Sequence, residues 1–182
     1  PGKARDGSRR PDVRDLDKAA SLPVLKTETM ISPVIIESIK LLKKDHDEVK
    51  KMLKDLEATT DRAVKTRQDL FGRLRFSLTV HEQMEEAVLY PALKEHEETR
   101  EIALEAYEEH DVVDTILGEL EQTPFDDETW HAKLTVMQEN LLHHIEEEEN
   151  EMFPKVRKLF DKETLESLGQ QMQQIKSQAR AA

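Results

Sequence analysis

The residues best suited to chemistry in this sequence form a His-x-x-x-Glu pattern that occurs twice, each time followed by an aromatic residue and a proline. The copies read HEQMEEAVLYP from His81 and HIEEEENEMFP from His144, so the pattern returns after 63 residues. Residues four apart lie on one face of a helix, about one turn from each other. The imidazole and the carboxylate of each copy could therefore bind one metal ion, since both are good metal ligands.

Two further histidines, His46 and His110, extend this pattern to an internal repeat. The segment DHDEVKKMLKDLE from Asp45 aligns with EHDVVDTILGELE from Glu109, so that His46 matches His110. The histidines of each half are 35 residues apart (46 to 81) and 34 residues apart (110 to 144). Two helical hairpins that repeat each other are expected to pack about a pseudo-two-fold axis and to direct equivalent residues toward one point.

Six polar residues on apolar helical stripes are therefore predicted to converge: His46, His81, Glu85, His110, His144 and Glu148. An unpaired buried polar group costs roughly a few kcal/mol, and an uncompensated carboxylate costs more. Two metal ions, each bound by two histidines and sharing the glutamates, would compensate these groups. Iron is the first choice, because bundle cores with mixed His and carboxylate ligands typically hold di-iron. Manganese comes next, and zinc follows because structural zinc prefers four closed ligands.

The elements that must position these residues are helices. Of the 182 residues, 36% are charged, 37% are hydrophobic and only 5 are glycine, which is typical of amphipathic helices. Apolar residues at three- and four-residue steps predict long helices from Ser32 to about 58 and over about 63–95, 98–121 and 127–160. The fold class is thus all-α, an up-down-up-down four-helix bundle with a flexible N-terminal arm and a short fifth C-terminal helix.

The chain is predicted to divide into three parts. Residues 1–31 contain Pro, Gly and Ser with mixed charge and little periodicity, which indicates a disordered or loosely docked arm. Residues 32–160 form the bundle, and residues 161–182 form a C-terminal helix packed on or beside it. Pro91 and Pro154 are expected to kink the second and fourth long helices.

Charge and composition restrict the classes of partner. The formal charge of −12 argues against nucleic acid or an anionic membrane surface as the main partner. The absence of cysteine excludes disulfides, thiolate metal sites and thiol catalysis. No apolar run reaches transmembrane length and no signal-sequence pattern is present. We therefore predict a cytoplasmic monomer or homodimer whose partner is a small molecule.

The series H…HxxxE…H…HxxxE, with LYP after the second histidine and MFP after the fourth, resembles the bacterial hemerythrin-like HHE cation-binding domain. The resemblance covers residues from about 34 to 160. It implies a non-haem di-iron centre, oxo- or hydroxo-bridged, with the six residues above as ligands. It also implies binding of, or reaction with, dioxygen, peroxide or reactive nitrogen species such as nitric oxide, in oxidative stress or oxygen sensing.

The sequence departs from the oxygen-carrying members of that family at two positions. The carriers have a second histidine one turn after the third-helix ligand, where this chain has Asp114. They also have an aspartate five residues after the last histidine, where this chain has Glu148 at four. A ligand set richer in carboxylate favours ferric iron, which suits peroxide chemistry better than reversible oxygen storage. We therefore hypothesise a peroxide-decomposing activity of catalase or peroxidase type.

Three further residues are candidates for an additional ligand or for a partner of one: Asp114, Tyr107 and Glu82. Asp114 lies one turn after His110, and Tyr107 lies three residues before it on the same helical face. Glu82 directly follows His81. For each residue there is an ordinary alternative role: a solvated or ion-paired carboxylate for the acids, and, as the commoner role, core packing with a satisfied hydroxyl for the tyrosine.

Two other classes of function are consistent with the sequence. One is a non-catalytic iron or cation storage or sensor domain, and the other is a metal-free helical interaction module that uses its acidic surface. The metal content of anaerobically purified protein separates the metal-free module from the other two. Optical spectra and peroxide consumption then separate a reactive centre from a store or sensor.

Overall fold

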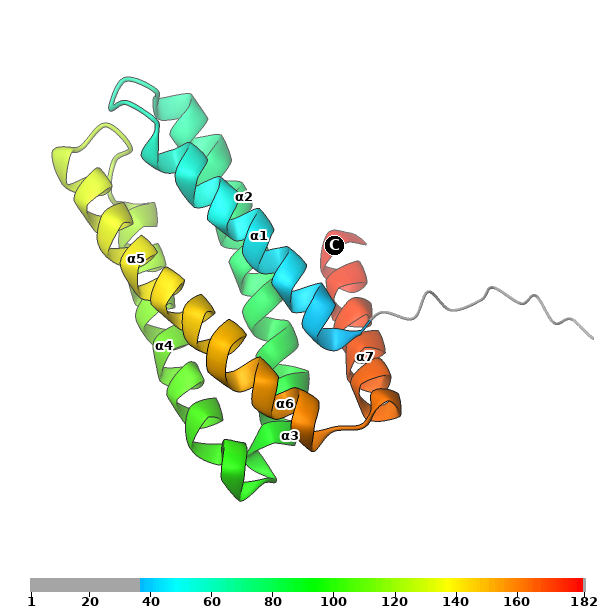
Figure 1. The fold of residues 1–182 in the computed structure, drawn as a ribbon. Helices are drawn as coiled ribbons and strands as arrows, with labels where there is room; N and C mark the ends of the chain where they lie inside the picture. The colour runs from blue at the N-terminus through cyan, green and yellow to red at the C-terminus, as the bar shows by residue number, and fades with distance from the viewer. Residues whose placement is uncertain (1–36, 182) are drawn as a thin grey trace, which may run out of the picture. The chain divides into compact units, whose positions relative to one another are not determined.

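The computed structural model describes residues 37–181, and this part of the chain contains helices and no strands (Figure 1). The helices are α1 (Ser38–Glu57), α2 (Val64–Met84), α3 (Tyr90–Lys94), α4 (Glu97–Gln122), α5 (Glu128–Glu147), α6 (Phe153–Leu159) and α7 (Lys162–Ala181). Two π-helical segments, η2 (Glu85–Leu89) and η3 (Glu148–Met152), join α2 to α3 and α5 to α6. The predicted arm over 1–31 and the predicted helix start at Ser32 lie outside the described residues.

Two antiparallel hairpins make up the bundle. Helix α1 packs against α2, and α4 packs against α5, while contacts of α1 with α5 and of α3 with α4 join the hairpins (Figure 1). Helix α7 follows α6 and packs on α1 and α2. The predicted fold class, an all-α four-helix bundle with a fifth C-terminal helix, is confirmed.

Short polar turns begin the later helices. Asp127 Oδ1 accepts a hydrogen bond from the backbone N–H of Thr129 at 2.7 Å and so caps α5. Asp161 Oδ1 accepts from the N–H of Thr164 at 2.9 Å in the first turn of α7. These caps satisfy backbone donors that have no partner inside the helix, which is why both helices begin where the sequence pattern indicates.

A buried arginine ties together the two loops at the end of the bundle away from α7. Arg67, only 1% exposed, donates to Thr59 Oγ1 at 2.9 Å and to the carbonyl of Phe125 at 2.6 Å. Its guanidinium also pairs with Asp61 at 2.9 Å and lies 5.0 Å from the ring centre of Trp130. The two hairpins are therefore joined by hydrogen bonds as well as by apolar packing.

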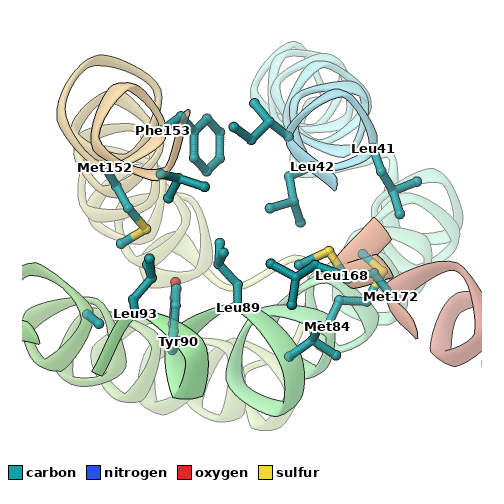
Figure 2. Close-up of a cluster of buried hydrophobic side chains, with 14 of the residues drawn as sticks. Leu41, Leu42, Met84, Leu89, Tyr90, Leu93, Met152, Phe153, Leu168 and Met172 are labelled. Atoms are coloured by element: carbon teal, nitrogen blue, oxygen red, sulfur yellow. The ribbon is translucent and has the colours of Figure 1, made fainter. Parts of the chain in front are cut away.

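A layer of polar residues divides the apolar core into two clusters. One cluster lies toward α3, α6 and α7, and Figure 2 shows part of it, including Leu42 of α1 and Leu168 and Met172 of α7. The other cluster lies toward the loops and includes Val49 and Trp130. His46 stands between Leu42 and Val49 along α1, so the polar layer crosses the middle of the bundle.

Pro91 and Pro154 are expected to kink their helices. In the structure a π-helical segment directly precedes each proline. The N–H of Tyr90 bonds to the carbonyl of Glu85, and the N–H of Phe153 bonds to that of Glu148. Both bonds span five residues, where an α-helix spans four. Because proline lacks an N–H and its ring collides with the preceding turn of an α-helix, a wider turn at this point accommodates it.

Candidate metal centre

The four predicted histidines form two pairs, and each pair meets through its Nε2 atoms. His46 Nε2 lies 3.1 Å from His81 Nε2, and His110 Nε2 lies 3.1 Å from His144 Nε2. The ring centres are 4.8 Å apart in both pairs, with interplanar angles of 65° and 66°. Each pair joins the two long helices of one hairpin. The two halves thus have nearly identical geometry, as the sequence repeat requires.

The two predicted glutamates lie between the histidine pairs. Glu85 Oε2 is 3.2 Å from His81 Nε2 in its own hairpin and 3.5 Å from His110 Nε2 in the other. Glu148 Oε2 is 3.6 Å from His144 Nε2 and 3.2 Å from His46 Nε2, again one histidine from each pair. Each carboxylate could therefore bridge two ions, one at each histidine pair.

The donor set fits a pair of metal ions. All six side chains are buried, yet Glu85 Oε1 and Glu148 Oε2 make no hydrogen bond of good geometry to the described residues. The potential ligand atoms of these six residues form two groups, in each of which the atoms lie within 4.8 Å of one another. The first group is His46, His81, Glu85 and Glu148, and the second is Glu85, His110 and His144. Cations would compensate these buried carboxylates, whose charge is otherwise expensive to bury.

Acidic neighbours of the six residues bind the outer nitrogens of three histidines. A carboxylate on Nδ1 fixes that nitrogen as the N–H and leaves the Nε2 lone pair directed at the centre. Sequence reasoning did not identify these partners, although each directly precedes or follows one of the six residues in the chain. The Nδ1 contacts are His46 with Glu149 (3.0 Å), His110 with Glu86 (2.9 Å) and His144 with Glu109 (2.7 Å).

The two central carboxyl groups have opposite pKa shifts. Burial raises the pKa of Glu85 well above its ordinary value, and the charge of Glu148 adds to this effect. Burial acts on Glu148 in the same direction, but the charges of His144 and His46 outweigh it and hold the pKa of Glu148 below its ordinary range. Ligand oxygens of the two carboxylates lie within 4.8 Å of each other. Two like charges so close in a dry site are unfavourable, so the protonated form of Glu85 is favoured when no cation is present. Binding of a cation would release that proton.

The histidines differ in the same way. Burial lowers the pKa of His81 well below its ordinary value, and the charge of His46 lowers it further. Burial also opposes protonation of His46 and His144, but contacts with Glu148 outweigh it and raise the pKa of both. His81 is therefore held in its neutral form, in which the imidazole can bind a metal, more firmly than His46 or His144.

Tyr90 brings a hydroxyl group to the centre that sequence reasoning missed. Its oxygen lies 3.0 Å from Glu148 Oε1, 3.2 Å from His110 Nε2 and 3.4 Å from Glu85 Oε2. Figure 2 shows this oxygen at the tip of the ring, directed toward the bundle interior. Burial raises the phenol pKa well above its ordinary value, with the charge of Glu148 adding, so the hydroxyl stays a hydrogen-bond donor.

The π-helical segment explains why the tyrosine could not be assigned from helical periodicity. In a regular α-helix, residue 90 would be turned about 140° away from Glu85. In η2 the N–H of Tyr90 bonds to the Glu85 carbonyl, so Tyr90 follows Glu85 by one wide turn and lies above it. The available signal was a difference between the two copies of the motif. LYP has a tyrosine at residue 90, whereas MFP has Phe153, which has no hydroxyl, at the equivalent position.

The three secondary candidates do not join the two groups of potential ligands. The hydroxyl of Tyr107 donates to the carbonyl of Glu86 at 3.2 Å, which is the carbonyl five residues before Pro91, and its ring packs edge-on against Tyr90. Asp114 is exposed on the surface of α4. Glu82 is buried, and burial together with the charges of Asp114 and Glu86 raises its pKa to about 7.

A four-helix bundle in which histidines and glutamates from both hairpins converge on one buried centre is a helical cation-binding protein. The family model for the hemerythrin HHE cation binding domain matches residues 37–156, and the chain belongs to this family.

A solved structure supports the assignment of the fold. The chain is similar to a hemerythrin HHE cation binding domain-containing protein from Mycobacterium kansasii, with 25% identity and a TM-score of 0.71. The match covers 80% of this chain and 88% of that chain. None of the curated proteins searched matches the sequence. Within residues 37–181, no helix combines the length and the apolar character needed to span a lipid bilayer.

Proposed function

We propose that the chain binds two iron ions at this centre and decomposes peroxide, with dioxygen or reactive nitrogen species as other small molecules of the same site. The observation that carries the proposal is the pair of buried glutamates, each placed between one histidine of either pair. His46 and His81 would hold one ion, His110 and His144 the other, and Glu85 and Glu148 would contact both.

The bound irons would supply the reversible electron transfer that peroxide decomposition needs. In the catalase-type reaction one peroxide takes up two electrons and two protons to give two waters, and a second releases two electrons and two protons to give dioxygen. The reaction therefore balances without an external reductant. Bundle cores with this type of ligand set commonly hold di-iron, which favours iron over manganese or zinc.

The chain itself would supply a hydrogen-bond donor and a dry site. The hydroxyl oxygen of Tyr90 lies within 3.4 Å of two carboxylates and one imidazole, where the hydroxyl could donate a hydrogen bond to a peroxide oxygen. The apolar clusters on both sides of the polar layer exclude water from the centre. We further propose that this function serves oxidative-stress defence or oxygen sensing in the cytoplasm.

The division of the chain follows the same function. We propose residues 32–160 as the metal-binding bundle, residues 161–182 as a helix that docks on it, and residues 1–31 as an arm outside the metal site. The alternative function, a non-catalytic iron store or sensor, is favoured by the enclosure of the centre, since all six residues are at most 4% exposed.

The test compares the wild-type chain with a ligand variant and a matched control. Protein is purified without oxygen from iron-replete cells, and bound iron and dioxygen release from hydrogen peroxide are measured. His81→Ala should lose iron and turnover, whereas His143→Ala, which removes an exposed histidine beside His144, should keep both. Absence of iron from the wild type would refute the proposal in favour of a metal-free module. Stable iron without turnover would support the store or sensor.

A further inference from the structure

The C-terminal helix reaches the metal centre through one buried ion pair. Lys176 of α7 pairs with Oδ1 of Asp45 on α1, and the two residues are only 8% and 7% exposed. Lysine is rarely buried to this degree unless it is paired. Because Asp45 directly precedes His46, this pair connects α7 to the half of the centre formed by His46 and His81.

This ion pair lies where the two halves differ in the contacts between acidic residues and histidine Nδ1 atoms. In the sequence repeat Asp45 matches Glu109, which accepts a hydrogen bond from His144 Nδ1 at 2.7 Å. Asp45 faces His81 Nδ1 in the same relation, but the distance is 4.0 Å, too long for a hydrogen bond. His81 Nδ1 is buried and has no hydrogen-bond partner among the described residues.

Two differences separate Asp45 from Glu109: its side chain is one methylene shorter, and a cation, Lys176, stands beside it. Within residues 37–181, no lysine or arginine lies within ion-pairing distance of Glu109, and α7 has no counterpart on that hairpin. The ion pair with Lys176 holds one oxygen of the Asp45 carboxylate at α7, while the other oxygen stays 4.0 Å from His81 Nδ1. A cavity of about 30 Å³ borders Asp45, Ser77, Val80 and Lys176, which leaves room for a water molecule or for movement of this carboxylate.

Other positions of the repeat give the two halves different charge. Glu149, the partner of His46, also pairs with Lys43 at 3.2 Å and with Lys50 at 2.9 Å. The residues that match these two lysines in the other half are Tyr107 and Asp114, neither of them cationic. Three lysines thus pair with the two acidic residues nearest the His46–His81 half, and their positive charge opposes the binding of a metal cation there.

We propose that Lys176 is a positioning residue that keeps Asp45 away from His81, and that the His46–His81 half therefore binds its metal ion more weakly than the His110–His144 half. This inference rests on the dinuclear site proposed above. Loss of a carboxylate partner from a metal-binding histidine typically lowers metal affinity 10- to 100-fold. The two ions should accordingly bind in sequence, and the ion between α1 and α2 should exchange first.

The experiment is a titration of the metal-free full-length chain with Co²⁺, followed by calorimetry and by visible absorption. The wild type should bind the ions in two steps whose affinities differ roughly 10- to 100-fold. In Lys176→Met the carboxylate of Asp45 is free to accept from His81, so the second step should strengthen about tenfold and approach the first. Lys162→Met, which removes an exposed lysine from the same helix, should retain the wild-type difference in affinity between the two steps.

Two further variants separate positioning from a general effect on α7. In the double variant Asp45→Asn/Lys176→Met no carboxylate is available to His81, so the second step should stay weak. Glu109→Gln acts on the other half without touching α7 and should weaken binding in the first step about tenfold. The affinities of the two steps should therefore become more similar. Its result stands even if Lys176→Met fails to fold.

Each outcome bears on one of the two proposals. Three outcomes would overturn the role of Lys176 and leave the dinuclear site intact. One is two steps of equal affinity in the wild type. The others are a wild-type ratio of the two affinities in folded Lys176→Met or in Glu109→Gln. Failure of the wild type to bind Co²⁺ would instead remove the proposed function, and the role of Lys176 with it.

Discussion

The hydroxyl of Tyr90 lies 3.0 Å from Oε1 of Glu148, although the two residues belong to different hairpins. The equivalent aromatic residue of the second half, Phe153, has no hydroxyl, and its ring stacks on His46 with ring centres 5.8 Å apart. Each half of the repeat supplies two histidines and one glutamate to the centre, whereas the phenol is present in one half only. A donor on one side gives a bound small molecule a preferred orientation.

Replacing Tyr90 by phenylalanine tests the role of this hydroxyl. The change copies the residue that the repeat already uses at Phe153, so the chain should fold and bind iron as before. If the centre decomposes peroxide as proposed, turnover should fall roughly 100-fold, the lower end of the effect of removing one donor from an oxyanion hole. Dioxygen release per bound iron is the measurement.

The matched control is Tyr107→Phe, because the hydroxyl of Tyr107 contacts the carbonyl of Glu86 and does not reach the centre. This variant should keep wild-type turnover. Equal turnover in Tyr90→Phe and wild type would show that the phenol takes no part in the reaction.

The buried carboxyl of Glu82 should make the metal-free protein sensitive to pH. Its pKa is raised from 4.5 to about 7 by burial and by the charges of Asp114 and Glu86. A raised pKa means that its contribution to stability is complete below pH 4.5 and is lost as the pH rises to about 7. Glu82→Gln cannot ionise, so at pH 8 the metal-free variant should exceed the metal-free wild type by up to about 3 kcal/mol.

Denaturant unfolding of chelator-treated protein between about pH 4 and pH 8 measures this difference. The two proteins should have similar stability near pH 4 and diverge above it. An exposed carboxylate on α4 provides the control, and Glu101→Gln should follow the wild-type curve. Parallel curves for Glu82→Gln and wild type would show that the carboxyl is solvated in solution.

Helical periodicity was sufficient to predict the fold, because apolar residues recur every three or four positions throughout residues 38–159. The predicted long helices over 63–95 and 127–160 correspond to α2 with η2 and α3, and to α5 with η3 and α6. Periodicity could not indicate the π-helical segments, since a single wider turn leaves the pattern on either side unchanged. The prolines gave the only local sign of them.

The candidate site was predictable where it depends on one helical face and on the repeat. His81 with Glu85, and His144 with Glu148, share a face at four-residue spacing, and the repeat supplied the other two histidines. The outer carboxylates could not be identified in this way, because they bind histidines of a neighbouring helix and depend on how two helices are aligned. The pair of Lys176 with Asp45 depends in addition on the docking of α7.

Removing the metal should destabilise the bundle. An ion present at 100 times its dissociation constant stabilises the folded state by about 2.7 kcal/mol, which raises the melting temperature of a chain of this size by roughly 5–10 °C. Glu148→Gln removes a charge that lies between the two histidine pairs, so metal should raise its melting temperature by at most half as much as in the wild type. Glu146→Gln, on the exposed face of α5, should keep it. Equal melting temperatures with and without metal in the wild type would contradict a centre held inside the fold.

The buried arginine at the loop end provides a test of stability that is independent of the metal. Arg67→Ala removes hydrogen bonds to Thr59 and Phe125 and leaves their acceptors without partners, so unfolding in urea should show a loss of about 3 kcal/mol. Arg67→Lys should recover only part of the lost stability, because an ammonium cannot reproduce the forked contacts of guanidinium. Arg73→Ala, at an exposed position of α2, should change stability by less than about 0.5 kcal/mol.

Metal content is the second measurement on the Arg67 variants. The apolar cluster that contains Val49 and Trp130 separates the loop end from the histidine pairs. Folded Arg67→Ala should therefore bind the same amount of iron as the wild type, even though it unfolds at lower urea concentration. Loss of iron from the folded variant would mean that the alignment of the two hairpins at the loops determines the distance between the histidine pairs. In that case the geometry of the centre would depend on the loop contacts as well as on the helices that carry its residues.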